Sequence, residues 1–535
     1  MYMAKVLGRK VKSRVLYWQY KLQDGKIRAV IAQPLDRRGN LPLVIDNKSA
    51  DQEGSWSTEL DGEFHQCLLA CEVLFSSDGP CLKQVGDDNF IGGICLQVQA
   101  CSRAQDSFGS KYTVDQTWSP LGGIATTGSM RCELITPPDC IRIRLRLCLS
   151  GEGVFRLTDL SITTTDYDEN FLSNRLVDQL ISTDKRPVQA VEEAMRVVLR
   201  SRFLPQYNPA LAFQNAAIVT KWDVETREPI SSCSEPAIVA IMLNQLALTP
   251  GLRVLEIGTG TGYNAALMAH MLQDGSNVWT VDLDEDVCNA AQNNLNLSGH
   301  GDVNVLHSDG WDGYFSAAPY NRIIVTACVY DLPTAWLHQL TPAGVLVVPF
   351  GSSAGQQRLL TFRKENNALK LLSSEPCAFM KMRGRGDLCL QPPTMLDDMG
   401  KPNRIMLPNS LLSSWDIMFL LLVMSSPFVA GRFQFSGSEN IYGSGNTYTG
   451  IFDPDLSGAC VLDSADFPSV LFSWGEDFTK QMHKIVTAWE SLGTPGPDEL
   501  QMVVYERPSS EVESGNAIVA HWRWMDCVLS VSNGK

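Results

Sequence analysis

The sequence predicts an α/β fold for the middle of the chain, with a β-sandwich before it and an α+β extension after it. Residues 185–365 alternate helical and strand patterns, which is typical of a parallel sheet covered by helices. Residues 1–175 carry β-rich runs separated by Gly, Asp and Pro, which favour a sandwich. Residues 366–535 mix both patterns. We therefore expect three domains in these 535 residues.

The composition is that of an ordinary globular protein and argues against a nucleic-acid partner. Hydrophobic residues make up 44% of the chain and charged residues 19%. The net charge is −15, whereas a protein that binds phosphate backbones needs a basic face. The longest apolar run, residues 417–424, is far shorter than the ~20 residues of a membrane helix, so it predicts a buried strand or core helix. Because the basic N-terminus is not followed by an apolar segment, we expect a cytoplasmic protein that does not enter a membrane.

The fifteen cysteines predict reduced thiols rather than disulfides or a metal site. Their number is odd, and the sequence has no export signal. His65, Cys67 and Cys71 come nearest to a metal-binding pattern, but they lie in an apolar run where cysteine acts as a small hydrophobic residue. We expect no metal.

The clearest strand of the N-terminal part is residues 141–147. Its strict alternation places Arg142, Arg144 and Arg146 on one face. A glycine-containing turn follows, and we expect a hairpin with the next β run, as in jelly-roll-like sandwiches. The other β-rich runs are residues 14–20, 27–31 and 154–162. The arginine face is explained either by solvation or by binding of an anion such as an acidic peptide.

The C-terminal part has one clear helix. Its apolar side chains share one face, which indicates packing rather than binding. They are Phe478, Met482, Ile485, Trp489 and Leu492. The helix is expected to stop at Gly493, and a strand is expected at residues 500–505. Residues 437–449 are rich in Gly, Ser and Asn and predict a loop.

The most informative stretch is an apolar strand that runs into three glycines. Gly258, Gly260 and Gly262 are spaced two apart and precede an Ala-rich helix at residues 264–271. Glycines let the backbone turn tightly and approach a ligand. The dinucleotide-binding fingerprint instead leaves two residues between its second and third glycines. Glu256 precedes the turn inside the strand.

A second acidic residue strengthens the prediction of a nucleoside cofactor. The strand at residues 277–281 ends in Asp282, twenty residues after Gly262. A carboxylate at the tip of the second strand can accept hydrogen bonds from two ribose hydroxyls. The third strand, residues 303–306, is followed by Asp309, which could accept a hydrogen bond from an adenine amine, and by Trp311, which could bound the ring. A plain Asp-Gly turn is the other explanation of Asp309 and Gly310.

Several motifs between residues 191 and 351 occur in the same order as in one enzyme family. They are Arg200-Ser201-Arg202-Phe203-Leu204-Pro205, Ser234-Glu235-Pro236, the run 248–260, Asp309-Gly310, Ala318-Pro319-Tyr320 and the run 333–351. This stretch resembles the protein-L-isoaspartate O-methyltransferase family of class I S-adenosylmethionine-dependent methyltransferases.

The resemblance implies a Rossmann-like fold, S-adenosylmethionine as cofactor, and esterification of an aspartyl or isoaspartyl carboxylate on a protein or peptide. It implies a catalytic role for Ser234. The cofactor-binding residues that it implies, together with the motifs above, are Glu256, Gly258, Thr259, Gly260, Gly262, Asp282, Leu283, Asp309, Gly310 and Trp311.

This sequence departs from the family pattern at three points. The family's Thr-Ile-Ser substrate loop is replaced by residues 230–234, Ser308 stands where the family has Gly, and large segments flank the shared region. Residues 231–234, residues 262–267 and the helix around Trp489 resemble a bacterial branch that accompanies ribosomally synthesised modified peptides. Repair of isoaspartyl residues and dedicated modification of one peptide are therefore both open.

The expected mechanism needs no general base, because a carboxylate is already an anion at neutral pH. Ser234 is expected to orient the acceptor carboxylate, and it is also placed to cap a helix at residues 235–247. Two other functions compete. One is a small-molecule O-methyltransferase whose sandwich captures the substrate, and the other is a binding protein that senses the cofactor.

Overall fold

The structure, a computed structural model, divides the chain into two compact units. The first comprises Met1–Leu172 and Pro205–Gln214, and the second comprises Ser173–Leu204 and Asn215–Lys535. The residues that the structure describes are the strands between residues 2 and 166 with Thr136, then 167–183, 186–207, 209–351, 357–387, 401–408, 413–425, 429–434, 447–453, 458–463, 470–506, 517–522 and 525–531. Helices within these ranges are all too short or too polar to span a bilayer. His65, which was weighed above as a metal ligand and set aside, and most of the predicted loop 437–449 lie outside them.

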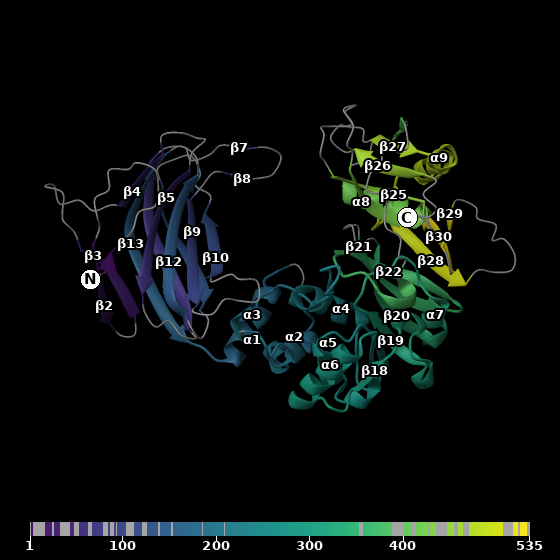
Figure 1. The fold of residues 1–535 in the computed structure, drawn as a ribbon, viewed down its shortest axis with the longest axis horizontal. Coiled ribbons are helices and arrows are strands. Elements are labelled where there is room, and N and C mark those ends of the chain that lie inside the picture. The colour runs from purple at the N-terminus through teal and green to yellow at the C-terminus, as the bar shows by residue number, and fades with distance from the viewer. Residues whose placement is uncertain are drawn as a thin grey trace. The chain divides into compact units, whose positions relative to one another are not determined.

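Among its described residues, the first unit holds two large antiparallel sheets and a two-stranded one, β7 (Gln84–Val85) with β8 (Phe90–Ile91) (Figure 1). One has the order β1 (Tyr2–Met3), β2 (Tyr17–Gln23), β3 (Lys26–Ala32), β13 (Gly153–Asp166), β6 (Cys67–Asp78) and β11 (Thr126–Ile135), with β4 (Leu43–Asn47) also on β13. The other has the order β10 (Tyr112–Ser119), β9 (Ile94–Ser102), β12 (Cys140–Ser150) and β5 (Glu53–Asp61). The strands predicted in this part are present. That the two sheets make a sandwich stays a prediction.

The hairpin predicted from residues 141–147 and 154–162 is wrong. The strand β12 pairs with β5 and β9, whereas β13 pairs with β3, β4 and β6 in the other sheet. A turn signal marks where a strand ends, but it does not say which strand lies beside the next one. On the predicted arginine face, the register sets Arg142 opposite Asp61 and Arg144 opposite Glu59.

The second unit is built on a ten-stranded sheet of the described residues. Its order is β18 (Asn304–His307), β17 (Val278–Asp282), β16 (Val254–Ile257), β19 (Tyr320–Val325), β20 (Leu340–Gly351), β21 (Gln357–Glu365), β22 (Ala368–Cys377), β28 (Leu500–Glu506), β30 (Met525–Val531) and β29 (Ile518–His521). The first five strands are parallel, and the remaining ones join antiparallel.

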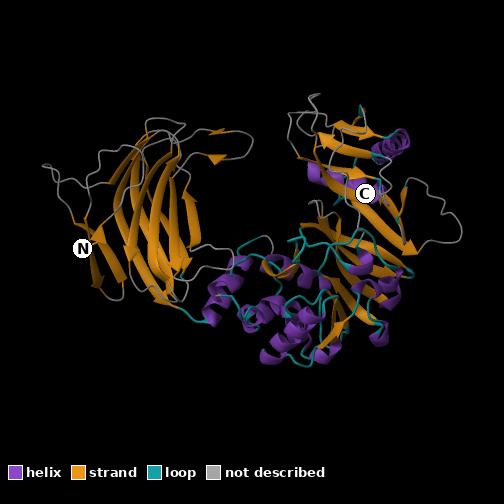
Figure 2. Ribbon diagram, viewed as in Figure 1, coloured by secondary structure: helices purple, strands orange, loops and turns teal. Residues whose placement is uncertain are grey.

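Helices cover both faces of the parallel strands. They are α4 (Pro236–Leu246), α5 (Tyr263–Leu272), α6 (Glu285–Leu297) and α7 (Thr334–Gln339). Figures 1 and 2 show α4, α5 and α6 on one side of these strands and α7 on the other. The order of helices and strands from α4 to β20 is the one that the sequence predicted, and this parallel part confirms the α/β prediction. From β16 the strand order runs outward in one direction through β17 and β18 and then in the other through β19 and β20. In parallel α/β sheets, ligands bind beyond the carboxyl ends of the strands at the point where the strand order reverses, here between β16 and β19.

Three α-helices precede this part among the described residues. They are α1 (Glu169–Ile181), α2 (Gln189–Val197) and α3 (Pro209–Ala212). Residues 187–202 carry apolar side chains at helical spacing, but the helix is interrupted at Val198, whose backbone is extended, and the short helix η1 (Arg200–Phe203) follows. A two-stranded sheet of β14 (Ile218–Trp222) and β15 (Pro229–Cys233) then leads to α4.

The C-terminal elements share a hydrophobic core with the parallel strands. The apolar run 417–424 is a helix, α8 (Ser414–Ser425), and the predicted apolar stripe lies on α9 (Glu476–Ser491). A further sheet has the order β23 (Asn403–Met406), β27 (Val470–Trp474), β26 (Ala459–Asp463), β25 (Thr447–Phe452) and β24 (Val429–Gln434). Trp522 stacks on Phe350 of β20 with ring centroids 4.7 Å apart, and both belong to one core cluster. The boundary at residue 365 stays a prediction.

Candidate functional site

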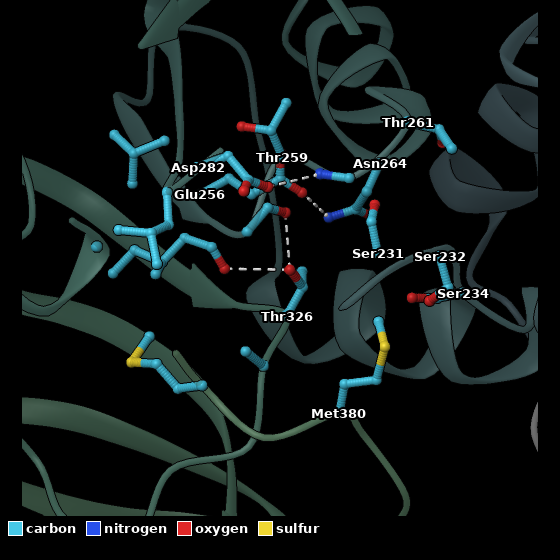
Figure 3. Close-up of a pocket in the computed structure, with 18 of the residues that line it drawn as sticks. Ser231, Ser232, Ser234, Glu256, Thr259, Thr261, Asn264, Asp282, Thr326 and Met380 are labelled. Carbon is cyan, nitrogen blue, oxygen red and sulfur yellow. Dashed lines mark hydrogen bonds between the residues drawn. The ribbon is translucent and has the colours of Figure 1, made fainter. Parts of the chain in front are cut away.

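A pocket lies at the carboxyl ends of β16, β17 and β19, and most predicted site residues line it (Figure 3). Those that line it are Ser234, Glu256, Gly258, Thr259, Gly260, Asp282, Leu283, Asp309 and Gly310. Figure 3 shows the serines on one side of the pocket and Glu256 and Asp282 on the other. Of the remaining two, Gly262 is the N-cap of α5 and Trp311 is buried against Trp336. The motifs that are far apart in the sequence thus meet in one place.

The glycine turn, residues 258–262, needs its glycines for two reasons. Gly258, Gly260 and Gly262 have φ angles of +102°, +53° and +85°, a region that side chains disfavour. The turn is also pressed against its surroundings. A Cβ atom on Gly258 would lie 2.2 Å from Thr326 Oγ1, whose hydroxyl donates a hydrogen bond to the Gly258 carbonyl at 2.7 Å. The turn is therefore held against the end of β19, and at its glycines no side chain separates the backbone from the pocket.

Glu256 is a fully buried carboxylate behind this turn. It accepts hydrogen bonds from Thr280 Oγ1 and from Asn264 Nδ2, each at 2.7 Å. Thr280 Oγ1 also lies 2.8 Å from Thr259 Oγ1, so the network continues into the turn. Burial raises the pKa of Glu256 to about 7, because the charged form is costly away from water. The network fixes the shape of the pocket floor.

Asp282 ends β17 and faces the glycine turn. Its Oδ2 accepts a hydrogen bond from the Gly260 amide at 3.2 Å, and its Oδ1 accepts one from the Asp284 amide at 3.3 Å. Burial raises the pKa of this carboxyl group above its ordinary value. A carboxylate has about four acceptor positions, so each oxygen can accept a further hydrogen bond from a ligand. Two adjacent hydroxyls of a ribose fit this arrangement.

An unsatisfied polar atom also points to a ligand with donor groups. Asn264 lines the pocket, and its Oδ1 is buried without a hydrogen-bond partner among the residues that the structure describes. Its Nδ2 is held by Glu256, which leaves the acceptor oxygen for another donor. Together with the bare glycine turn and Asp282, this site fits S-adenosylmethionine, which carries an ammonium group and ribose hydroxyls. Within the described residues, no cluster of side chains suits a metal ion.

Asp309 is held by main-chain donors on both of its oxygens. Oδ1 accepts a hydrogen bond from the Trp311 amide at 2.9 Å, which begins the short helix η3 (Gly310–Asp312). Oδ2 accepts one from the Arg385 amide at 2.8 Å. The structure therefore contains the Asp-Gly turn. Asp309 also lines the pocket. A contact between its carboxylate and the amine of an adenine stays a prediction.

Sequence reasoning missed one side of the pocket, the 380–387 segment. Met380, Lys381, Met382 and Arg383 all line the pocket. The segment is joined to the end of β19 by hydrogen bonds from the Cys328 amide to the Met380 carbonyl and from the Met382 amide to the Cys328 carbonyl, each 2.8 Å long. Arg383 then pairs with Asp284, beyond β17. The one local signal in this segment is Gly384 and Gly386 among basic residues, and such a pattern does not indicate that the segment lies at the pocket.

The serine segment, residues 230–234, forms the opposite side of the pocket. It consists of the end of β15 followed by Ser234. The expectation that Ser234 caps the next helix is wrong. The helix α4 starts one residue later, with Glu235 at the N-cap and Pro236 in the first turn, and the Ala237 amide donates instead to Asn215 Oδ1 at 2.9 Å. The Ser234 side chain is not used as a cap.

Comparison with known proteins gives consistent results. The family model described as protein-L-isoaspartate(D-aspartate) O-methyltransferase matches residues 171–386. The protein-L-isoaspartate O-methyltransferase of Methanococcoides burtonii is 35% identical over 33% of this chain and 83% of its own length. That of Yersinia enterocolitica is 36% identical over 37% of this chain and 88% of its own length. Residues 1–170 and 387–535 lie outside the match to the family model.

Solved structures of similar proteins carry the same description. A protein-L-isoaspartate O-methyltransferase matches with a TM-score of 0.43 and 22% identity, over 63% of this chain and 96% of its own. A putative one from Plasmodium falciparum, in complex with S-adenosyl-L-homocysteine, matches with a TM-score of 0.34 and 18% identity, over 39% of this chain and 98% of its own.

Proposed function

Because this chain belongs to the protein-L-isoaspartate O-methyltransferase family, we propose that it methylates aspartyl or isoaspartyl carboxylates of proteins or peptides with S-adenosylmethionine. The observation that carries the proposal is the meeting of the glycine turn, Asp282 and Ser234 in one pocket. The parallel part of the chain has the Rossmann-like fold of class I methyltransferases.

The cofactor would be held by the side of the pocket that carries the acidic residues. Asp282 would accept the ribose hydroxyls, and the glycine turn would pass beneath the cofactor without side chains. Asn264 Oδ1 would accept a hydrogen bond from the ammonium group, because its partner amide is fixed on Glu256. Asp309 would lie toward the adenine, and Trp311, which does not line the pocket, would support it by donating its amide to Asp309. When bound, the cofactor supplies a methyl group on a positively charged sulfur, which a carboxylate oxygen can displace.

The serine segment would hold the acceptor. A carboxylate is ionised at neutral pH, so this chain needs no residue to remove a proton from it. The task left to the protein is to orient one oxygen and to exclude water. The Ser234 hydroxyl is not used as a helix cap, and it can donate a hydrogen bond to the oxygen that does not react. We assign it this role.

Methyl transfer to a matched pair of peptides tests the proposal. One peptide carries a single isoaspartyl residue, and the other carries aspartate at the same position. Tritiated methyl groups from S-adenosylmethionine should enter at least one peptide, and mild alkali should release them as methanol, because the product is a methyl ester. Transfer of label into a form that resists alkali, or no transfer to either peptide at high enzyme concentration, would contradict the proposed activity.

The same pair of peptides separates repair from dedicated modification. Preference for the isoaspartyl peptide indicates repair, whereas preference for aspartate in one particular sequence indicates dedicated modification, as in the branch associated with ribosomally synthesised peptides. The family model matches residues 171–386, so residues 1–170 lie outside it, which supports an additional role for that part of the chain. We propose that the first unit serves substrate recognition.

A further inference from the structure

A buried arginine lies directly behind the serine segment. Arg200 of η1 is 0% exposed, and its Nη2 atom lies close enough to donate hydrogen bonds to three main-chain carbonyls. The acceptors are the carbonyls of Ala216 at 2.9 Å, Cys233 at 3.2 Å and Ser234 at 2.9 Å. Burial of a guanidinium group is costly unless polar groups compensate it. Here the carbonyl oxygens do so, and these bonds hold the serine segment in one place.

Two of the three acceptors belong to residues that line the pocket. Cys233 ends β15 and Ser234 follows it, so the arginine holds the chain at the point where it leaves the strand. The third acceptor, Ala216, adjoins Asn215, whose Oδ1 accepts a hydrogen bond from the Ala237 amide in the first turn of α4. The backbone on both sides of Ser234 is therefore fixed by groups outside the pocket.

We propose that Arg200 is a positioning residue that holds Ser234 where its hydroxyl can orient the acceptor carboxylate. The inference rests on the proposed function, because Arg200 acts only through Ser234, and Ser234 has a role only if the protein methylates a carboxylate. Arg200 does not line the pocket. Its contribution is geometric. A displacement of about 1 Å at a reacting group can cost on the order of a hundredfold in rate.

The other end of α4 offers a matched control. Arg322 of β19 donates hydrogen bonds to the carbonyls of Leu246, at 2.5 Å, and Ala247, at 3.2 Å, where the helix ends. Like Arg200, it binds main-chain carbonyls beside the same helix. Neither Arg322 nor its two acceptors line the pocket. Replacement of Arg322 should therefore reduce stability without affecting the methyl transfer itself.

The test is a double-mutant cycle in the full-length protein with Arg200→Lys and Ser234→Ala. Lysine keeps the charge but lacks the planar guanidinium group and its reach. Arg200→Lys should lower kcat on an isoaspartyl peptide by about tenfold or more and leave the Kd of S-adenosylmethionine within about threefold. With Ser234→Ala already present, Arg200→Lys should lower kcat by less than about twofold, because no hydroxyl remains to be positioned. Arg322→Lys should lower Tm and leave kcat within about twofold.

Each result has a distinct meaning. An equal loss of kcat from Arg200→Lys with and without Ser234 would overturn the inference, because the arginine would then act by another route. Full turnover by Ser234→Ala alone would overturn the assigned role of that serine and the inference with it. A wild-type protein that methylates neither the isoaspartyl peptide nor its aspartyl counterpart would contradict the proposed function itself.

A second variant keeps the inference testable if Arg200→Lys does not fold. Asn215 is an exposed residue that holds the helix side of the same segment, so Asn215→Ala leaves no buried charge without partners. It should lower kcat by about threefold, and the loss should disappear when Ser234→Ala is present. Persistence of the loss in that background would overturn the inference.

Discussion

The two sides of the pocket differ in charge. The cofactor side carries three carboxylates, Glu256, Asp282 and Asp309, while the serine segment on the acceptor side carries none. A positively charged sulfonium compound is attracted by the first side, and an anionic acceptor is repelled by it. The acceptor carboxylate can approach most easily along the serine segment and the 380–387 segment, which brings Lys381 and Arg383 to the pocket. The distribution of charge therefore separates the two substrates of the reaction.

The two sides also differ in how their polar groups are held. On the cofactor side, the carboxylates are held in place by other side chains, as Glu256 is by Thr280 and Asn264, or by main-chain amides, as Asp309 is. On the acceptor side, the Arg200 side chain holds the main chain. Substitutions on the first side should consequently affect cofactor affinity, and those on the second side should affect turnover.

Asp282→Ala should have the largest effect and should affect cofactor binding. Loss of a charged acceptor for two hydroxyls costs on the order of 1.5–3 kcal/mol, so the Kd of S-adenosylmethionine should rise more than about tenfold in calorimetry. Asp286→Ala is the control, because Asp286 is exposed, pairs with Lys221 and does not line the pocket. Equal affinities of the Asp282 variant and the wild type would show that the cofactor does not bind at the end of β17.

Ser234→Ala should show the opposite pattern. We expect a loss of about tenfold in kcat, with the Kd of S-adenosylmethionine nearly unchanged, because the hydroxyl acts on the acceptor. The melting temperature should change little, since Ser234 is not the cap of α4. A parallel loss of cofactor affinity and turnover would indicate that the two sides of the pocket are not independent.

Glu256→Gln should change the pH dependence of stability. In the folded protein the pKa of Glu256 is about 7, and in the unfolded chain it is near its ordinary value of 4.5. Between these values the folded state binds the proton more strongly than the unfolded chain, so stability falls as pH rises, with a slope of at most about 1.4 kcal/mol per pH unit for one proton. Chemical denaturation without cofactor should show a smaller slope for the variant.

Asp286→Asn provides the control for this experiment. Lys221 lowers the pKa of Asp286, so its titration lies below the same pH window. Its stabilising effect is present above its ordinary pKa and is lost only as pH falls further. The slope between about pH 4.5 and 7 should therefore match that of the wild type. An unaltered slope in Glu256→Gln would show that this carboxyl group does not titrate there.

The cofactor side was predictable because its signals are local. The glycine spacing, Glu256 two residues before the turn and Asp282 at the end of the next strand all lie within single βα units. A parallel sheet brings the ends of such units together. The order of elements from α4 to β20 followed from periodicity for the same reason. Ser234 was identified through resemblance to the family, since a lone serine before a helix suggests a cap, and that interpretation was wrong.

The remaining side could not be predicted because it depends on contacts between distant residues. The 380–387 segment comes about fifty residues after Cys328, yet it pairs with that residue and reaches Asp309. The same limit explains the wrong hairpin prediction, because β12 and β13 follow one another in the sequence but belong to different sheets. Strand pairing is decided by the whole sheet, whereas a turn motif reports only the local change of direction.

The smallest effect is expected at Arg385, where side-chain and main-chain contributions can be separated. Its guanidinium group pairs with Asp312 at 2.7 Å, but both side chains are more than half exposed, and such pairs contribute about 0–1 kcal/mol. Its amide holds Asp309. Arg385→Ala should thus leave the Kd of S-adenosylmethionine within about threefold. Arg385→Pro removes the amide hydrogen and should weaken binding further than Arg385→Ala does. Equal affinities of these two variants would show that the Asp309 contact does not shape the cofactor side.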